Sequence, residues 1–290
     1  MGRKHVNAVF EPEFENHIEY SNGEGFPAIW ITEPTEYDKK GRCIARDYLG
    51  VYPSTIPGDG MDPFGWMALD LGGRYYDEGM ACVDADDEEH RVNAFRSAEL
   101  LYRHAQALGN PAASLCLGYV YSYDRCAGNY YDIWMHDAAS LDDKEEIDSY
   151  RKMAAFQAFE KAAGAGLVEG MYKFGDCYSM GIGCEPNIQK ALDWYQRAED
   201  AARLEESSDA VSGSIQFRLA RCFENGEGCN QDFNRAARHY RLAVTHLQNA
   251  VDEGNWFYQG VLAKARKGLK RSEQADALSK EVSARFQAAD

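Results

Sequence analysis

The sequence predicts an all-α protein: a solenoid of antiparallel helical pairs that follows a short non-helical N-terminal extension. Two observations favour the solenoid. A first-helix pattern of small and aromatic residues occurs four times, and each copy precedes a second helical stretch with a signature of its own. A third observation defines the extension, since five of the eight prolines lie within residues 1–60 and proline disfavours helix interiors.

The extension contains two segments with the composition of β-strands. Residues 26–32 (FPAIWIT) and 42–52 (RCIARDYLGVY) are rich in aromatic and β-branched side chains, and the polar stretch EYDKKG separates them. This arrangement is typical of a β-hairpin. An irregular arm that lies along the solenoid is the alternative.

The first-helix pattern places a small residue five positions before a second one, an aromatic three residues later and a turn residue three after that. Neither helix of a pair can bury its apolar stripe alone, so such pairs stack on their neighbours. We expect the second small residue where two helices cross most closely. Two copies end in Gly-x-Gly, where glycine can take the positive φ that ends a helix. The four copies are Ala68-Gly73-Tyr76-Gly79, Ala113-Gly118-Tyr121-Asp124, Gly170-Gly175-Tyr178-Gly181 and Ile215-Ala220-Phe223-Gly226.

The second helices repeat an alanine, an aromatic and another alanine, as in Ala191, Tyr195 and Ala198. Insertions interrupt the array at Asp84–Glu89, at about Arg125–Asp148 and near Leu204–Ser212. A decayed fifth unit at Leu262-Ala263 has lost its turn glycines, which is expected of a capping repeat. It is followed by a final helix at about Glu273–Gln287. The expected organisation is therefore an extension (1–60), a solenoid (61–269) and a C-terminal capping helix (270–290).

The residues from Gly170 to Ala198 carry a family resemblance. They combine the small, aromatic and Gly-x-Gly positions with the second-helix motif Lys-Ala-x2-Trp-Tyr-x2-Ala, and this combination resembles the Sel-like repeat (SLR) family of the tetratricopeptide superfamily. The resemblance extends from near Met61 to Leu269. It implies a right-handed α/α superhelix that acts as an adaptor or scaffold for other proteins.

Charge and hydropathy exclude several classes of partner. The formal net charge is −16, with a sequence pI of about 4.9. Affinity for nucleic acids and anionic membranes depends on basic patches, so we expect neither as a partner. No run approaches the length of about 18 apolar residues of a membrane span, and the N-terminus lacks the apolar core of a signal peptide. We therefore expect a cytoplasmic protein.

The eight cysteines include two pairs in the same register, Cys177/Cys184 and Cys222/Cys229. The first interpretation is structural: Cys82, Cys184 and Cys229 replace a buried aliphatic residue. A second, suggested by the family resemblance, is a disulfide within each repeat, although no signal peptide indicates an oxidising compartment. A third is zinc, which the spacing within a pair disfavours, because structural zinc ligands are usually two to four residues apart.

No catalytic constellation is evident. The seven histidines form no recognisable pairing with a nucleophile. The acidic run that begins at Asp84 lacks the glycine and the final glutamate of a calcium loop. The Gly-x-Gly turns follow helices rather than strands, which argues against phosphate binding. We expect no catalytic residue, no metal and no cofactor.

The outward face of the first helices is the candidate binding site. At 100° per residue, three positions of each first helix point away from the core, and large apolar side chains occupy several of them. Apolar surface patches usually mark contact sites, so we expect a groove that binds a protein or peptide with the aromatics as anchors. The candidate groove residues are Asp70, Arg74, Leu115, Tyr119, Tyr172, Asp176, Phe217 and Arg221.

The sequence thus predicts a non-enzymatic interaction module, and the negative charge suggests a basic partner segment. In one alternative, the N-terminal arm covers the groove through the aromatic side chains of Phe10, Phe14, Phe26 and Trp30. A regulatory subunit would follow if a true partner displaced that arm. The remaining alternative is an enzyme with a site between the extension and the insertion around Trp134.

Overall fold

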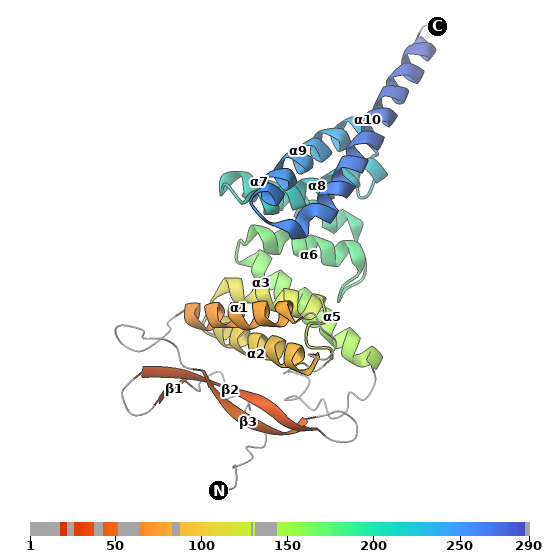
Figure 1. Ribbon diagram of the computed structural model, residues 1–290. Coiled ribbons are helices and arrows are strands. Elements are labelled where there is room, and N and C mark those ends of the chain that lie inside the picture. The colour runs from red at the N-terminus through yellow and green to blue at the C-terminus, as the bar shows by residue number, and fades with distance from the viewer. Residues whose placement is uncertain are drawn as a thin grey trace. The chain divides into compact units, whose positions relative to one another are not determined.

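The computed structural model describes residues 18–21, 26–37, 43–51, 64–82, 88–128, 130 and 144–287, and for the strands it describes the backbone (Figure 1). The chain folds as two compact units, residues 1–162 and 163–290. Stacked helices form most of each unit, so the prediction of an all-α solenoid with a non-helical N-terminal extension is confirmed.

The extension forms a three-stranded antiparallel sheet in the order β1-β2-β3, with β1 at Ile18–Ser21, β2 at Phe26–Tyr37 and β3 at Cys43–Val51. The expected hairpin is the β2–β3 pair, and β1 is a strand that was not predicted. The register of this pair shifts between Pro34 and Glu36. Proline has no N–H to donate to a ladder, which is why it occurs at such irregularities.

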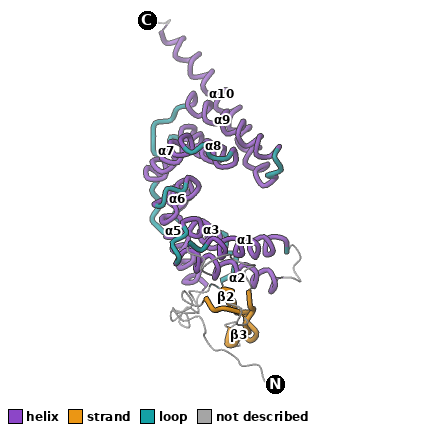
Figure 2. Tube along the Cα trace, turned by 90° about the vertical axis from the view of Figure 1, so that its left-hand side faces the viewer, coloured by secondary structure: helices purple, strands orange, loops and turns teal. Residues whose placement is uncertain are grey.

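Four described helices follow the sheet in the first unit (Figure 2). α1 (Trp66–Ala81) pairs with α2 (Glu88–Ala107), and α2 in turn contacts both α3 (Pro111–Ser122) and β2. α5 (Lys144–Gly164) packs on α3. α3 begins sharply, since Pro111 occupies its first turn and the Asn110 side chain accepts a hydrogen bond from the Ala112 N–H at 3.0 Å.

Glycines lie where helices of this unit cross closely. One of them, Gly118, is at the predicted position, and the other, Gly72, lies one residue before the predicted Gly73. A Cβ on Gly118 would lie 2.3 Å from the Phe159 ring, so α3 and α5 can approach this closely only at a glycine. In α1 the corresponding residue is Gly72, where a Cβ would lie 2.7 Å from the Tyr102 ring. A Cβ on Gly73 would meet nothing within 4 Å. The prediction of a close crossing at Gly73 is therefore wrong.

The second unit repeats the helical pair. α6 packs on α7 and α8 packs on α9, while the 3-10 turn η4 leads into α10, which packs on α9 (Figure 1). Buried alanines and aromatics fill these interfaces, with Tyr195 in one pair and Tyr240 in the next. The bounds are α6 Val168–Met180, α7 Ile188–Leu204, α8 Asp209–Asn225, α9 Phe233–Asp252, η4 Trp256–Tyr258 and α10 Gln259–Gln287.

The Gly-x-Gly turns take the predicted conformation. Gly181 ends α6 with φ 68° and Gly226 ends α8 with φ 71°, both in the left-handed region that glycine adopts without strain. The following helices are capped alike: Asn187 accepts a hydrogen bond from the Lys190 N–H, and Asp232 accepts one from the Arg235 N–H, each at 2.9 Å. The two turns thus share one backbone conformation and one capping pattern.

A carboxylate braces each of these helical pairs to a later helix. Glu224 of α8 accepts a hydrogen bond from the Tyr240 hydroxyl of α9 at 2.6 Å and two from the Arg271 guanidinium of α10, both at 2.9 Å. The acid is therefore held from within its own pair and from the next helix. Asp176 of α6 has an equivalent pair of partners in the site below.

α10 is one continuous helix of 29 residues. The boundary expected at 269/270 and the separate final helix from Glu273 therefore fall inside a single element. Gly268, not Ala263, makes the close approach, since a Cβ there would lie 2.3 Å from the Tyr240 ring. Beyond Ser272 most described side chains of α10 are exposed, including Leu278.

Several predicted features lie outside the described residues. These are Phe10 and Phe14 of the proposed arm, the side chains of Phe26 and Trp30, residues 84–87 of the acidic insertion, and Trp134 in the longer one. The predictions about a covering arm and about an enzymatic site beside Trp134 therefore stay predictions.

Candidate functional site

A small hollow in the second unit brings together three of the predicted groove residues. This second-unit hollow has a volume of about 170 Å³ and lies among α6, α7, α8 and α10. Asp176 is at its floor, and Phe217 and Arg221 are on its rim. Its other lining residues include Met180, Tyr195, Arg218 and Val261.

The floor is an ion pair whose two partners, Arg218 and Asp176, both make further hydrogen bonds. The Arg218 guanidinium donates two hydrogen bonds to the Asp176 carboxylate, at 2.6 and 2.5 Å, and a third to the Ser214 carbonyl at 2.8 Å. The Tyr195 hydroxyl also donates to Asp176, at 2.8 Å. These charge-assisted contacts are mostly shielded from water and fix the relative positions of α6, α7 and α8. Asp176 is therefore a structural group rather than a ligand for a partner.

Protonation states follow from burial and this pairing. Burial alone would lower the pKa of Arg218, but the adjacent Asp176 carboxylate outweighs it, so that pKa is raised and the guanidinium stays charged. Burial also raises the pKa of Tyr195, which keeps its hydroxyl a donor. The pKa of Cys222, at the same hollow, is raised to about 12 by burial, so no thiolate nucleophile forms there near neutral pH.

The rim offers apolar surface beside charges of both signs. Phe217 is half-buried and packs edge-to-face on Tyr240, with ring centroids 6.0 Å apart. Met180 is 63% exposed. The exposed Arg221 guanidinium lies 4.0 Å from the Glu227 carboxylate, too far for a strong hydrogen bond. This rim can therefore contact a partner's side chain without first losing a buried interaction.

Tyr172, a predicted groove residue, does not lie on an exposed face. Its side chain is 2% exposed, its hydroxyl donates to Glu169 at 2.9 Å, and the Arg218 guanidinium lies over its ring, 4.4 Å from the centroid. The expected outward position is thus covered by α8 of the following pair. The prediction that Tyr172 is exposed is wrong.

The predicted residues of the first unit do not converge. Asp70 and Arg74 form an exposed ion pair of 2.8 Å along α1. Leu115 and Tyr119 are half-buried on α3, where Tyr119 packs edge-to-face on Phe159 with ring centroids 6.0 Å apart. Their assignment to a binding groove stays a prediction.

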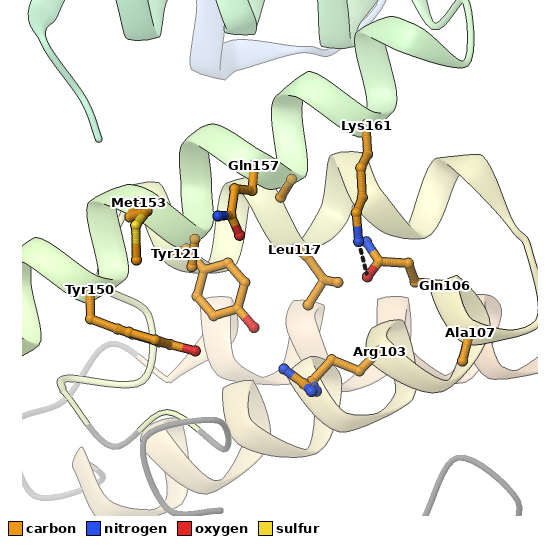
Figure 3. Close-up of a pocket in the computed structure, with 11 residues that line it drawn as sticks. Arg103, Gln106, Ala107, Leu117, Tyr121, Tyr150, Met153, Gln157 and Lys161 are labelled. Carbon is orange, nitrogen blue, oxygen red and sulfur yellow. Dashed lines mark hydrogen bonds between the residues drawn. The ribbon is translucent and has the colours of Figure 1, made fainter. Parts of the chain in front are cut away.

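A larger hollow in the first unit was missed by sequence reasoning. This first-unit hollow has a volume of about 420 Å³ and lies between α2, α3 and α5 (Figure 3). It is lined by two cationic side chains, Arg103 of α2 and Lys161 of α5, over a floor that includes Leu117. The signal in the sequence is a cation on each of the two second helices, Arg103 and Lys161, whereas the predicted groove used only residues of the first helices.

No disulfide joins the cysteines of the described residues. Cys184 donates to the Cys177 carbonyl and Cys229 to the Cys222 carbonyl, each at 3.6 Å, so the two pairs share one geometry. Within the described part of the chain, no three His, Cys, Asp or Glu side chains gather where they could hold a metal ion.

No helix among the described residues is both long enough and apolar enough to cross a membrane. The cytoplasmic location stays a prediction.

Stacked antiparallel pairs with small residues at the crossings define the class of protein, an α-solenoid. Residues 168–202 and 215–246 match the model of the Sel1 repeat, and they coincide with α6–α7 and with most of α8–α9. These two segments of the chain are therefore similar to Sel1 repeats.

The chain is similar to a Sel1 repeat protein from Oxalobacter formigenes, at 20% identity and a TM-score of 0.42, with 76% of each chain covered. It is also similar to a protective antigen of uropathogenic Escherichia coli that displays an SLR fold, at 17% identity and a TM-score of 0.30, with 78% of this chain and 64% of that chain covered. No curated protein matches the chain.

Proposed function

We propose that the protein is a non-enzymatic adaptor that binds a segment of a partner protein across the second-unit hollow. Sel1 repeats in general mediate contacts between proteins. The observation that carries the proposal is the rim of this hollow, where apolar surface at Phe217 and Met180 adjoins the exposed Arg221 above a rigid floor.

The rim chemistry indicates the kind of segment that fits. An apolar partner side chain can pack on Phe217 and on Met180, whose flexible thioether adapts to different shapes. A basic partner residue can pair with Glu227, and the net charge of −16 attracts such a segment over a longer range. A basic segment with one apolar anchor is the expected ligand.

The chemistry of the second-unit hollow favours binding over catalysis. The Asp176 carboxylate is already engaged with Arg218 and Tyr195, and Cys222 carries a thiol with a raised pKa. Neither a free base nor an activated nucleophile is offered to a substrate by these residues. Binding is therefore the function that this arrangement supports best.

The test is a peptide selection followed by calorimetry. Peptides selected on the immobilised protein are titrated into wild type and into the surface variants Met180→Glu and Arg221→Glu, with Leu204→Glu as the matched control. Leu204 is 81% exposed and does not line the hollow. We expect loss of affinity in Met180→Glu, a gain of affinity for basic peptides in Arg221→Glu because a like charge beside Glu227 is removed, and wild-type affinity in the control. Equal affinity in all three variants would contradict the proposal.

The regulatory alternative has its own test. If the extension occupies the groove, deletion of residues 1–60 raises the affinity of the same peptides, because competition within the chain is removed. Unchanged affinity would exclude this alternative.

A further inference from the structure

We infer that the first-unit hollow binds an acidic peptide segment of a partner protein. Arg103 and Lys161 both line it, and none of its described lining residues is acidic. Gln106, Gln157 and Tyr150 add amide and hydroxyl groups. In a chain with a net charge of −16, a hollow with this lining is locally opposite in charge to the protein as a whole.

The Lys161 ammonium is placed for a ligand rather than for a structural ion pair. It donates to the Gln106 side-chain oxygen at 3.5 Å, and Gln106 is itself held by a 2.8 Å hydrogen bond to Ser114. Within the described part of the chain, no carboxylate lies within 4.0 Å of Lys161. By contrast, Lys152 of the same helix pairs with Asp148 at 2.6 Å. A carboxylate that enters the hollow would therefore find a positioned cation.

Arg103 supplies the second cation from the opposite wall. Figure 3 shows its side chain reaching from α2 toward the Tyr121 hydroxyl, while Lys161 reaches down from α5 toward Gln106. A guanidinium can bind a carboxylate through two parallel hydrogen bonds. Glu99, which accepts a hydrogen bond from Tyr121 at 3.0 Å, is fully buried and does not line the hollow.

The shape and the apolar surface favour a peptide over a bare ion. The volume of about 420 Å³ falls in the range of about 300–1,000 Å³ that is typical of ligand sites. Leu117 and Ala158 form a buried floor, whereas Met153 is 46% exposed at the rim beside the exposed Gln157. In a segment that alternates acidic and apolar residues, the acids can pair with the cations on the two walls and the apolar side chains can pack on the floor.

This inference is independent of the function proposed for the second-unit hollow, because no residue lines both. The two sites would take segments of opposite charge. Affinity at the first-unit hollow should fall as salt is added, since its cations are partly exposed and are screened by ions.

Calorimetric titration of the full chain tests the inference. The probe is a capped octapeptide, Leu-Glu-Glu-Leu-Glu-Asp-Leu-Glu, and its control replaces every acid by the corresponding amide. We expect saturable binding of the acidic peptide and none of the amide peptide. Lys161→Gln should weaken binding by about tenfold or more, Lys161→Arg should retain it, and the matched variant Lys152→Gln should leave it unchanged.

Arg103→Gln should also weaken binding, and the exposed Lys161 keeps the test valid if the Arg103 variant fails to fold. Absence of saturable binding, equal binding of the amide peptide, or wild-type affinity in Lys161→Gln would overturn the inference. Full displacement of the peptide by an equal concentration of free glutarate would assign the hollow to small dicarboxylates and overturn the peptide assignment. Loss of binding in Met180→Glu would place the peptide in the second-unit hollow instead.

Discussion

Two adjacent glycines of α1 should respond in opposite directions to alanine. A Cβ on Gly72 would lie 2.7 and 2.8 Å from two ring carbons of Tyr102 and 3.3 Å from the Cβ of Leu101, whereas a Cβ on Gly73 would meet nothing within 4 Å. Both glycines lie inside the helix Trp66–Ala81. The structure therefore predicts that Gly72→Ala destabilises the protein and Gly73→Ala stabilises it.

The magnitudes follow from two terms. Alanine in place of a helical glycine such as Gly73, whose added Cβ would meet nothing within 4 Å, gains about 1 kcal/mol, because the unfolded chain loses backbone freedom. At Gly72 the same gain is opposed by overpacking of about 1–3 kcal/mol, since the buried Tyr102 ring must move. The propensity gain is common to both variants and cancels between them. The difference in their free energies of unfolding is thus about 1–3 kcal/mol, the overpacking term alone.

Urea unfolding, followed by far-UV circular dichroism, measures this difference. A control variant, Tyr102→Leu, shortens the side chain that a Cβ at position 72 would strike, and in that background Gly72→Ala should lose most of its cost. If Gly73→Ala were instead the more destabilising of the two, the close crossing would lie at Gly73, as the sequence pattern had indicated, and the packing described for α1 and α2 would be refuted.

Two further predictions concern the second unit. Arg218→Met leaves the Asp176 carboxylate without its counterion and should lower the free energy of unfolding by about 3 kcal/mol. The double variant Arg218→Met/Asp176→Asn should recover part of this loss. Additive losses of the two single variants in a double-mutant cycle would contradict the pairing. Stability should also fall at alkaline pH. Burial raises the pKa of Cys177 from 9.0 to about 12 and raises the pKa of Tyr195, so the unfolded chain releases these protons first and the free energy of unfolding declines as pH rises above about 9. Urea titrations at a series of pH values test this, and a flat profile would refute it.

The repeats and their turns could be predicted because they depend on local chemistry. Gly181 and Gly226 take a positive φ, which the Gly-x-Gly spacing already indicated. Gly118 and Gly175 lie at close crossings, as their place in the pattern predicted. The error at Gly73 has a simple cause. Residues three and four positions apart lie on the same helix face, so spacing alone could not distinguish Gly72 from Gly73.

The candidate site was less predictable because it depends on neighbours beyond one helical pair. Tyr172 was expected on the outward face of its own helix, yet Arg218 of the next pair covers its ring. Arg103 and Lys161 belong to second helices that are far apart in the sequence, and only the stacking of α2, α3 and α5 brings them to one hollow. A helical wheel drawn for one helix shows neither the contact of Arg218 with Tyr172 nor the shared hollow of Arg103 and Lys161.

The two carboxylate braces also determine which neighbours a repeat can have. Asp176 lies one residue after the close-approach position of α6, whereas the equivalent position in α8 is Arg221, and the bracing acid there is Glu224. Each acid therefore meets its arginine at a different height along the next helix. Duplicating or excising the α8–α9 pair would set an acid beside a helix whose arginine is out of register. Each acid therefore pairs with an arginine in the matching position of its own neighbour, and these pairs fix the order of the units. Simple copying of one unit could not lengthen this array.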